Sequence, residues 1–308
     1  MTLNANNKGH LSAKIVNAFQ EDAAPKYLAT LNKEGTPNIV PILSLDAIDQ
    51  DTITFGDYMI WKTKRNLLEY NKVACAVTSM DGFQTYIVKG DFQNFVKKGE
   101  LVERANLKPL FRYNAYTGVR GVGIIKVKQA YPPKKLINIP FILNILKLKI
   151  GKGKVKSLEE SNSDKNINGI HHRIIEKFKG ITSFKMLAYK DDDDYPMIIP
   201  ISSMSPKKDG RRLVFSFSGI KDEINRIPLM SKVAISLFKL QTEKNIIRLA
   251  FSNKIPWGEI QPIAYQLKGV YQGTGKFRGV SLGVIDITEV YSASPPLPGE
   301  LISTHSTL

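Results

Sequence analysis

An internal repeat constrains the fold of this chain more than any other feature of its sequence. The segment YLATLNKEGTPNIVPILS (27–44) is matched 159 residues later by MLAYKDDDDYPMIIPISS (186–203). Four more segments match in the same order: ITFGDYM with LVFSFSG, NKVACAV with SKVAISL, YIVKG with YQLKG, and GIIKVKQAY with GVIDITEVY. A repeat of this length indicates a duplicated structural unit, so we predict two copies of one fold in the 308 residues.

Each copy has the pattern of a mostly β unit. The matched segments are short, rich in Val, Ile, Tyr and Phe, and bounded by Gly, Asp, Asn or Pro, which is typical of strands and turns. Helices are expected only at 13–21, at 62–70 and at 170–180. Several short antiparallel strands with few helices predict a small barrel in each half. We divide the chain into barrels at 10–133 and 166–295, joined by a linker or lid at 134–165.

Composition places the chain among globular proteins and favours anionic partners. Hydrophobic residues make up 43% and charged residues 23% of the sequence, and the net charge is +16. The single Cys75 excludes an internal disulfide, fits a reducing compartment and, with apolar neighbours, is expected to be buried. The N-terminal residues lack a signal-peptide pattern, and no run of about 18 apolar residues occurs, so a cytoplasmic location is expected.

The order of the repeated segments resembles one known family. An opening helix is followed by "LATL…G.PN.VPI", "TFGD", "KTKRNL", "NKVACAV" and "Y.VKG", which is similar to the pyridoxamine 5′-phosphate oxidase-like FMN-binding split-barrel superfamily. The resemblance covers most of 10–131 and, more weakly, 166–291. It implies two tandem six-stranded split β-barrels that form an intramolecular pseudo-dimer, with FMN in a cleft between them, and a chain that is complete as a monomer although a higher oligomer stays open.

The resemblance also implies where a phosphate would bind. In the family, the turn and helix after the third strand hold the FMN phosphate. The residues here at that place are Lys62, Thr63, Lys64 and Asn66, and a dianionic phosphate requires such charged donors and helix-start amides. The alternative is a solvated basic turn that only begins a helix.

The same stretch of the second copy carries the opposite charge. At an offset of 160, Lys62 and Thr63 are replaced by Asp222 and Glu223, and two carboxylates repel a phosphate. We therefore expect one competent phosphate site, on the first copy, with the second copy providing the other wall of the cleft.

The flavin ring is expected against the strand that contains NIVPILS. Pro41, Ile42 and Leu43 are the candidates for main-chain contacts with the ring, although residues of such a strand also fit a purely structural role. Trp257, in an insertion of the second copy, is a candidate for stacking on a ring or for ordinary packing.

The segment KKLINIPFILNILKLKIGKGKVK (134–156) combines seven lysines with many apolar residues and no acid. It is too short and too charged to span a bilayer. We favour a linker docked on the barrels or a lid over the cleft, and contact with a membrane surface is the alternative.

Other polar groups give weaker signals. The adjacent His171 and His172 do not face each other on a helix and make a poor metal site, so haem with a histidine ligand is a minor alternative cofactor. The run from Asp191 to Asp194 lacks the spacing of a calcium loop and is expected to be a solvated turn. Nucleotide-binding and metalloprotease motifs are missing from the sequence, and no nucleic-acid partner is expected.

These features together predict an FMN-binding flavoprotein that acts as an oxidoreductase on an unidentified small-molecule acceptor. The flavin would carry the redox chemistry, and whether the chain is an enzyme at all stays open. The alternatives are a non-catalytic protein that binds flavin, deazaflavin or haem, and a membrane-peripheral adaptor that uses 134–156. A pyridoxamine phosphate oxidase proper would need a second cationic cluster, which the sequence does not reveal.

Overall fold

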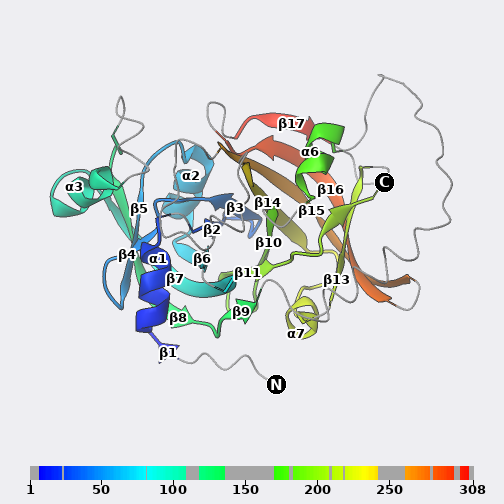
Figure 1. Cartoon of the computed structure of the whole chain (residues 1–308), viewed down its shortest axis with the longest axis horizontal. Coiled ribbons are helices and arrows are strands. Elements are labelled where there is room, and N and C mark those ends of the chain that lie inside the picture. Colours follow the sequence, from blue (N-terminus) through cyan, green and yellow to red (C-terminus); the bar gives the residue numbers. More distant parts are fainter. Residues whose placement is uncertain are drawn as a thin grey trace.

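The structure of the chain, a computed structural model, describes residues 7–22, 24–80, 82–108, 118–135, 170–179, 183–207, 210–217, 219–241, 261–277, 280–294 and 299–304. Within these ranges the chain forms two halves that lie side by side, β1 to β9 in one and β10 to β17 in the other (Figure 1). Trp257 and all of the predicted linker except Lys134 and Lys135 lie outside the described residues.

The first half is an antiparallel sheet in the order β3-β2-β6-β7-β8-β5-β4, with β1 added to β8 and β9 added to β7. Three helices accompany it among the described residues. The elements are β1 (Asn7–Lys8), α1 (Ala13–Gln20), β2 (Lys26–Leu31), β3 (Pro37–Pro41), β4 (Asp46–Ala47), β5 (Thr52–Gly56), α2 (Trp61–Glu69), β6 (Lys72–Thr78), β7 (Gln84–Val96), α3 (Glu100–Leu107), β8 (Val122–Ala130) and β9 (Lys134–Lys135).

The second half repeats this arrangement in the order β11-β10-β14-β15-β16-β13-β12, with β17 added to β16. Its elements are α6 (His172–Lys177), β10 (Ser183–Lys190), β11 (Pro196–Pro200), β12 (Ser205–Pro206), β13 (Arg212–Ser216), α7 (Lys221–Ile224), β14 (Lys232–Gln241), β15 (Gln261–Phe277), β16 (Val280–Ser292) and β17 (Leu301–Thr304). In neither sheet do the two end strands of the order pair with each other, so each half is an open, split barrel. The predicted fold class, mainly β with two tandem split barrels, is confirmed, but the described sheets have nine and eight strands and not the six expected, because short strands such as β4 and β12 extend them.

The first hairpin of each half follows from its turn residues. In the first half, Leu31 pairs with Pro37, and Gly35 takes a φ of 72° in the turn, a value that favours glycine. In the second half, Lys190 pairs with Pro196, and the corresponding turn residue Asp194 has a φ of 66°. The strands that follow, β3 and β11, begin and end with proline, and proline suits a strand at the edge of a sheet because it lacks an N–H.

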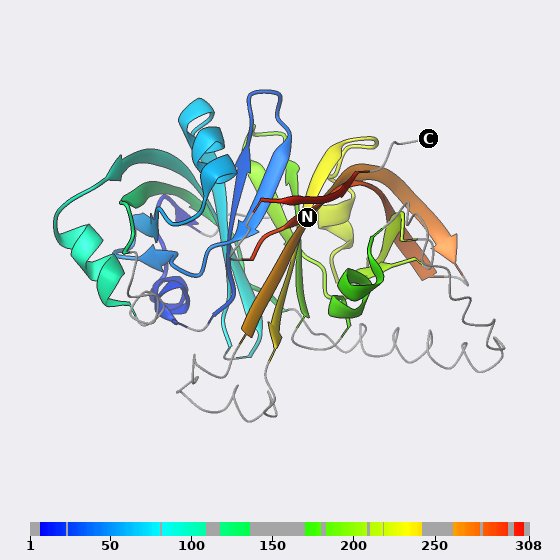
Figure 2. The same ribbon diagram turned by 90° about the horizontal axis from the view of Figure 1, so that it is seen from above.

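The two halves share one hydrophobic core. Tyr27, Ala29 and Ile39 of the first sheet are fully buried in the cluster that also holds Leu187 and Ile235 of the second. Figure 2 shows β2, β3 and β6 lying alongside β10 and β11 where the halves meet. Burial of apolar area at this junction contributes about 25 cal/mol per Å², so the halves stabilise each other.

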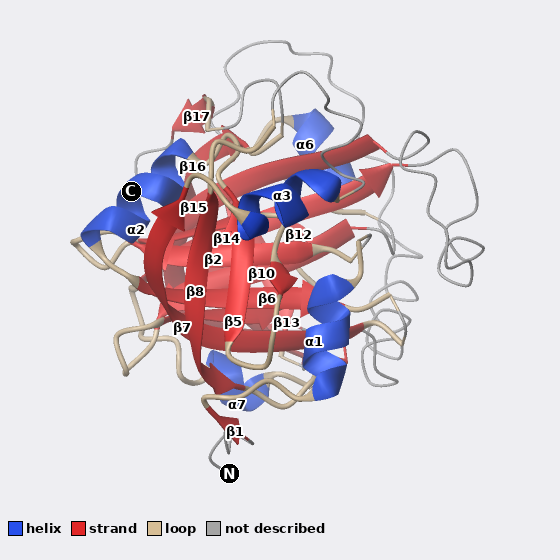
Figure 3. Cartoon of the chain, turned by 90° about the vertical axis from the view of Figure 1, so that its left-hand side faces the viewer, coloured by secondary structure: helices blue, strands red, loops and turns tan. Residues whose placement is uncertain are grey.

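The opposite side of the first sheet packs inside its own barrel. Leu28 alternates with Tyr27 and Ala29 along β2 and faces a separate core with Phe19 of α1. Figure 3 shows α1, α2 and α3 on the outside of the strands. Cys75 is buried in this core, as predicted, and burial raises the pKa of its thiol.

Candidate functional site

The principal cavity among the described residues lies between the two halves and has a volume of about 590 Å³. That volume is in the range of small-molecule sites, roughly 300–1,000 Å³. Its walls come from β3 and the turn after it, from the start of α2, and from the ends of β15 and β16. The lining residues are Asn38, Val40, Pro41, Ile42, Leu43, Ser44, Gly56, Tyr58, Met59, Ile60, Trp61, Lys62, Thr63, Arg65, Pro262, Gln266, Tyr291, Ser292, Ala293 and Gly299.

The outer edge of β3 supplies main-chain groups to this cavity. The Ile42 N–H donates to the Lys26 carbonyl of β2 at 2.8 Å, so this N–H is already hydrogen-bonded within the sheet. Hydrogen bonds alternate along an antiparallel pair, and the Pro41 carbonyl therefore points away from β2. The Leu45 N–H donates to the Ile42 carbonyl at 3.1 Å and closes a turn after β3. All three predicted ring-contact residues line the cavity, and the Pro41 carbonyl is the main-chain group that the sheet leaves for a ligand.

The start of α2 forms the polar end of the cavity. The Lys64 N–H makes the first intrahelical bond, to the Ile60 carbonyl at 2.7 Å, so the amides of Trp61, Lys62 and Thr63 precede that bond. The Ile60 N-cap side chain supplies no capping hydrogen bond to them. Amides at this end of a helix favour an anion.

The four predicted phosphate residues take different places. Lys62 and Thr63 line the cavity. The Lys64 ammonium instead pairs with Asp57, and the Asn66 side-chain amide donates to Thr30 Oγ1 at 3.0 Å. These two residues are outside the lining, although they belong to the same helix.

A line of hydrogen bonds connects Thr63 to the second half. The Gln266 amide donates to Asn38 Oδ1 at 3.0 Å and to the Ile39 carbonyl at 2.7 Å. The Asn38 amide in turn donates to Thr63 Oγ1 at 3.2 Å. Because Thr63 accepts this bond, its hydroxyl hydrogen can be donated to another acceptor. Asn38, Thr63 and Gln266 are all buried, so the packing of the two halves fixes the direction of this hydroxyl.

Positive charge gathers on the second-half side of α2. The Lys62 Nζ lies 4.4 Å from the centre of the Tyr291 ring. Burial, together with repulsion from the adjacent Lys268 of β15, lowers the pKa of Lys62 to about 8. Burial raises the pKa of Tyr291, and its hydroxyl donates to Glu289 Oε2 at 2.6 Å. Arg65 adds another cation to the lining.

The corresponding region of the second half is closed by ion pairs. Glu223, at the position equivalent to Thr63, is buried and pairs with Lys134 of β9. Asp222, equivalent to Lys62, is exposed. The negative charge that was predicted at this place in the second copy is therefore that of Glu223, which already pairs with Lys134.

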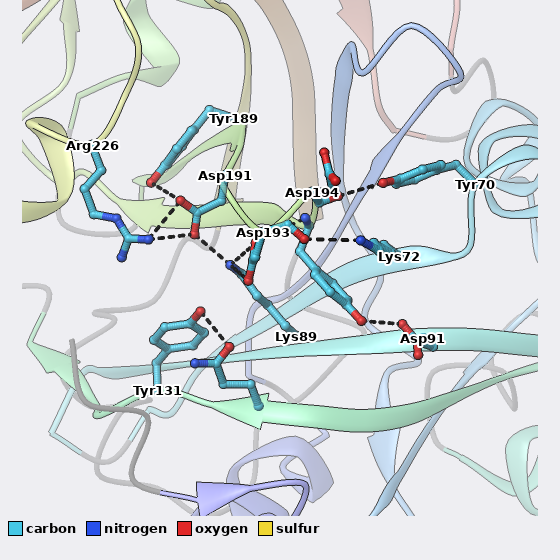
Figure 4. Close-up of polar contacts among 12 residues, drawn as sticks. Tyr70, Lys72, Lys89, Asp91, Tyr131, Tyr189, Asp191, Asp193, Asp194 and Arg226 are labelled. Carbon is cyan, nitrogen blue, oxygen red and sulfur yellow. Dashed lines mark hydrogen bonds and ion pairs between the residues drawn. The ribbon is translucent and has the colours of Figure 1, made fainter. Parts of the chain in front are cut away.

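The run from Asp191 to Asp194 is the turn that was expected, and Asp192, Asp193 and Asp194 are exposed. Asp191 departs from the expectation, because it is buried at the junction of the halves (Figure 4). Asp191 accepts from the Lys89 ammonium at 2.7 Å and from Arg226 Nη2 at 3.0 and 3.1 Å. Burial alone would lower the pKa of Lys89, but its bonds to Asp191 and Asp193 hold that pKa above the usual value. The burial of Asp191 could not be expected from the sequence, because the two cations that pair with it, Lys89 and Arg226, are distant from it in the chain.

Sequence reasoning also missed Arg65, Gln266, Lys268 and Tyr291. The first is in the predicted phosphate segment itself. The other three belong to the repeated segments YQLKG and GVIDITEVY, where the repeat gave the strands but not which side chains would face the first half.

Metal ligands and membrane spans give negative results in the part of the chain that is described. Groups of three or more His, Cys, Asp or Glu residues that could hold a metal ion do not occur there. None of its helices is both long enough and apolar enough to span a bilayer.

No protein-family model and no curated protein matches this chain. Solved structures do. HupZ of Group A Streptococcus has 20% identity and a TM-score of 0.33, with 39% of this chain and 91% of that chain covered. An FMN-binding protein from Syntrophomonas wolfei has 20% identity and a TM-score of 0.35, with 40% and 85% covered. A NimC/NimA family protein from Clostridium acetobutylicum has 15% identity and a TM-score of 0.31, with 39% and 89% covered.

The chain is similar to FMN-binding and pyridoxamine 5′-phosphate oxidase-like split-barrel proteins. Each of these similarities spans about two fifths of its length.

Proposed function

We propose that this chain binds one FMN in the cavity between its halves and acts as a flavin-dependent oxidoreductase on a small-molecule acceptor. One observation carries the proposal: a single cavity joins the anion-binding start of α2 to the open main-chain edge of β3. FMN has a dianionic phosphate at one end and a ring with a hydrogen-bonding edge at the other. The sequence resemblance to FMN-binding split barrels is the reason for naming this cofactor.

The polar end of the cavity fits a phosphate. The first amides of α2 and the Thr63 hydroxyl are donors, and the Lys62 ammonium adds charge. Hydrogen bonds between such charged groups and an anion contribute about 1.5–3 kcal/mol each. This set differs from the one expected from the sequence in that Arg65 replaces Lys64 and Asn66 among the lining residues.

The other end of the cavity fits a flat ring with alternating hydrogen-bonding groups. The Pro41 carbonyl on the edge of β3 is an acceptor, and Leu43 of the following turn, which also lines the cavity, would contribute its N–H as a donor. Val40 and Ile42 add apolar surface, which excludes water from a bound ring. Trp61, 62% exposed at the start of α2, is held by Arg120, whose guanidinium lies 4.8 Å from the ring centre.

When bound, the flavin supplies the transfer of a hydride or of electrons. The chain contributes binding and orientation. Thr63 and Lys62 hold one end, and the β3 edge fixes the plane and direction of the ring. Gln266 ties that edge to the second half, so the two walls of the cavity keep their spacing.

A haem-binding function has less support. The described lining of the cavity contains no histidine, and His171 and His172 belong to α6 of the second half. The membrane-surface role of 134–156 depends, apart from Lys134 and Lys135, on residues outside the described ranges.

Absorption spectroscopy after reconstitution with FMN and desalting tests the proposal. We expect about one FMN per chain, because the region equivalent to the phosphate end carries the paired Glu223 in the second half. Thr63→Val keeps the side-chain shape, removes the hydroxyl and is expected to lower FMN affinity about tenfold, the effect of one hydrogen bond to a charged group. Asp222→Asn, a change at the exposed equivalent of Lys62, is the matched control and should leave the affinity unchanged. Failure of the unmodified protein to retain FMN would refute the proposal.

A further inference from the structure

One lysine occupies the same position in both halves. Lys89 of β7 and Lys268 of β15 are the lysines of the matched segments YIVKG and YQLKG. Their neighbours across the strand pair also correspond, with Lys89 opposite Gln129 and Lys268 opposite Glu289. Each lysine therefore stands at the same place on the face that meets the other half, and any difference between them arises from what the other half presents.

The charge of Lys89 is neutralised inside the chain. Its Nζ lies 2.7 Å from Asp191 Oδ2 and 2.8 Å from both carboxylate oxygens of Asp193. The side chains of Lys89 and Asp191 are each 1% exposed, so this pair is away from solvent, whereas Asp193 is exposed. Figure 4 shows Lys89 reaching from its strand into the turn of the second half.

The charge of Lys268 is not neutralised in this way. The residues equivalent to Asp191 and Asp193 in the first-half turn are Asn32 and Glu34, and Glu34 is exposed. Among the described residues, no carboxylate forms an ion pair with Lys268. Lys268 is two residues from the lining residue Gln266 along β15, so both point to the same face of the strand. There it lies beside Lys62, whose Nζ is 4.4 Å from the ring centre of Tyr291, the residue paired with Gln266.

Lys62 and Arg65 line the cavity, and Lys268, which is not one of the lining residues, lies beside Lys62. The carboxylate of Glu289, opposite Lys268 on β16, also accepts the Tyr291 hydroxyl at 2.6 Å and offsets only one of the three positive charges. Like charges at short range repel each other, and a bound anion would offset that repulsion because it attracts each of the cations. The junction at Lys89 is thus ion-paired, whereas the equivalent junction at Lys268 has an excess of positive charge.

We infer that Lys268 is a ligand-binding residue, which completes with Lys62 and Arg65 a subsite for a dianionic phosphate at the junction of the two halves. The inference rests on the proposed function in that the phosphate belongs to a ligand of the same cavity. The phosphate comes either from the flavin or from a second, phosphorylated molecule. In both cases the second half takes part directly in binding and does not only form a wall.

Lys268→Gln tests the subsite, because glutamine keeps the length and polarity of the side chain without its charge. Lys126→Gln is the control, since Lys126 is a half-exposed lysine of the first sheet that pairs with Asp51 and is not in the cavity lining. Titrations with FMN and with riboflavin are compared for each protein. Thermal unfolding is measured with and without inorganic phosphate at constant ionic strength, before and after loading with FMN.

We expect Lys268→Gln to weaken FMN binding about tenfold or more and to leave riboflavin binding unchanged, which identifies the flavin phosphate as the occupant. Unchanged FMN affinity, with loss of the stabilisation of the FMN-loaded protein by inorganic phosphate, also supports the subsite and assigns it to a second molecule. If the unmodified chain binds no flavin but is stabilised by phosphate, and Lys268→Gln is not, the subsite stands and the proposed function fails. Equal responses of Lys268→Gln and the unmodified chain to both FMN and phosphate overturn the inference.

Discussion

The buried Lys26 gives a prediction in which stability and pH are directly linked. Its side chain at the start of β2 is fully buried, and its Nζ has no hydrogen-bond partner among the described residues. Burial lowers the pKa of Lys26 from 10.5 to about 7, and repulsion from Lys108 acts in the same direction, whereas Asp46 opposes it. Lys26 therefore destabilises the folded state whenever the unfolded chain would hold its proton.

The size of this effect follows from the two pKa values. The difference of 10.5 − 7, about 3.5 units, corresponds at about 1.36 kcal/mol per unit to a penalty of ~5 kcal/mol below pH 7. Because the folded pKa is below the unfolded one, the folded state binds fewer protons between pH 7 and 10.5. The penalty is full below pH 7 and disappears as the pH rises through this window.

Lys26→Met removes the charge and keeps much of the volume. We expect the free energy of unfolding to rise by about 3–5 kcal/mol at pH 6 and the gain to shrink steadily towards pH 10. Denaturant unfolding of the variant and the unmodified chain at a series of pH values measures both quantities.

Lys185→Met is the matched control, because Lys185 occupies the equivalent position of the second half. Its Nζ donates to the carbonyls of Phe178 at 3.0 Å and Ser202 at 2.8 Å. Burial lowers the pKa of Lys185 to about 8, but methionine there leaves two buried carbonyls without their donor, at about 1–3 kcal/mol each. The control should gain little or lose stability. A Lys26→Met variant no more stable than its parent at pH 6, or one whose gain is independent of pH, would refute the reasoning.

Two further substitutions test the candidate site and the junction of the halves. Lys62→Gln is expected to weaken FMN binding about tenfold, and Lys64→Gln by less than about twofold, because Lys62 lines the cavity and Lys64 pairs with Asp57; fluorescence titration measures both, and the reverse order would contradict the assignment. Lys89→Met is expected to lower the free energy of unfolding by about 3 kcal/mol, because it leaves the buried Asp191 with only one of its cations; a loss below about 1 kcal/mol in denaturant unfolding would show that the junction does not depend on this ion pair.

The repeat made the fold predictable because strand order depends on patterns that are local in sequence. Each matched segment became a strand at the same place in its sheet, and the segment after the third strand became α2 at Trp61–Glu69, within one residue of the predicted range 62–70. The turn containing Gly35 was also readable, since its backbone conformation is one that glycine favours.

The details of the candidate site depended on contacts that no local pattern contains. Lys64 and Asn66 have the right chemistry for a phosphate, but in the fold Lys64 pairs with Asp57 and Asn66 donates to Thr30. Asp191 looked solvated because the lysine that pairs with it is 102 residues away in the chain. The pairing of Lys89 with Asp191 could not be assigned before the two sheets were packed together.

The two halves illustrate how a duplicated chain can separate binding from assembly. In a symmetric dimer, both junctions would need the same residues, so a charge added to one would be added to the other. Here Asp191 neutralises Lys89 at one junction, while Lys268 keeps its charge beside the cavity at the other. An ion-paired junction stabilises the association of the halves without a ligand. At the other junction the cations repel one another, and a bound anion would relieve that repulsion, so the two ends of the same interface have different roles: one stabilises the fold and the other would bind a ligand.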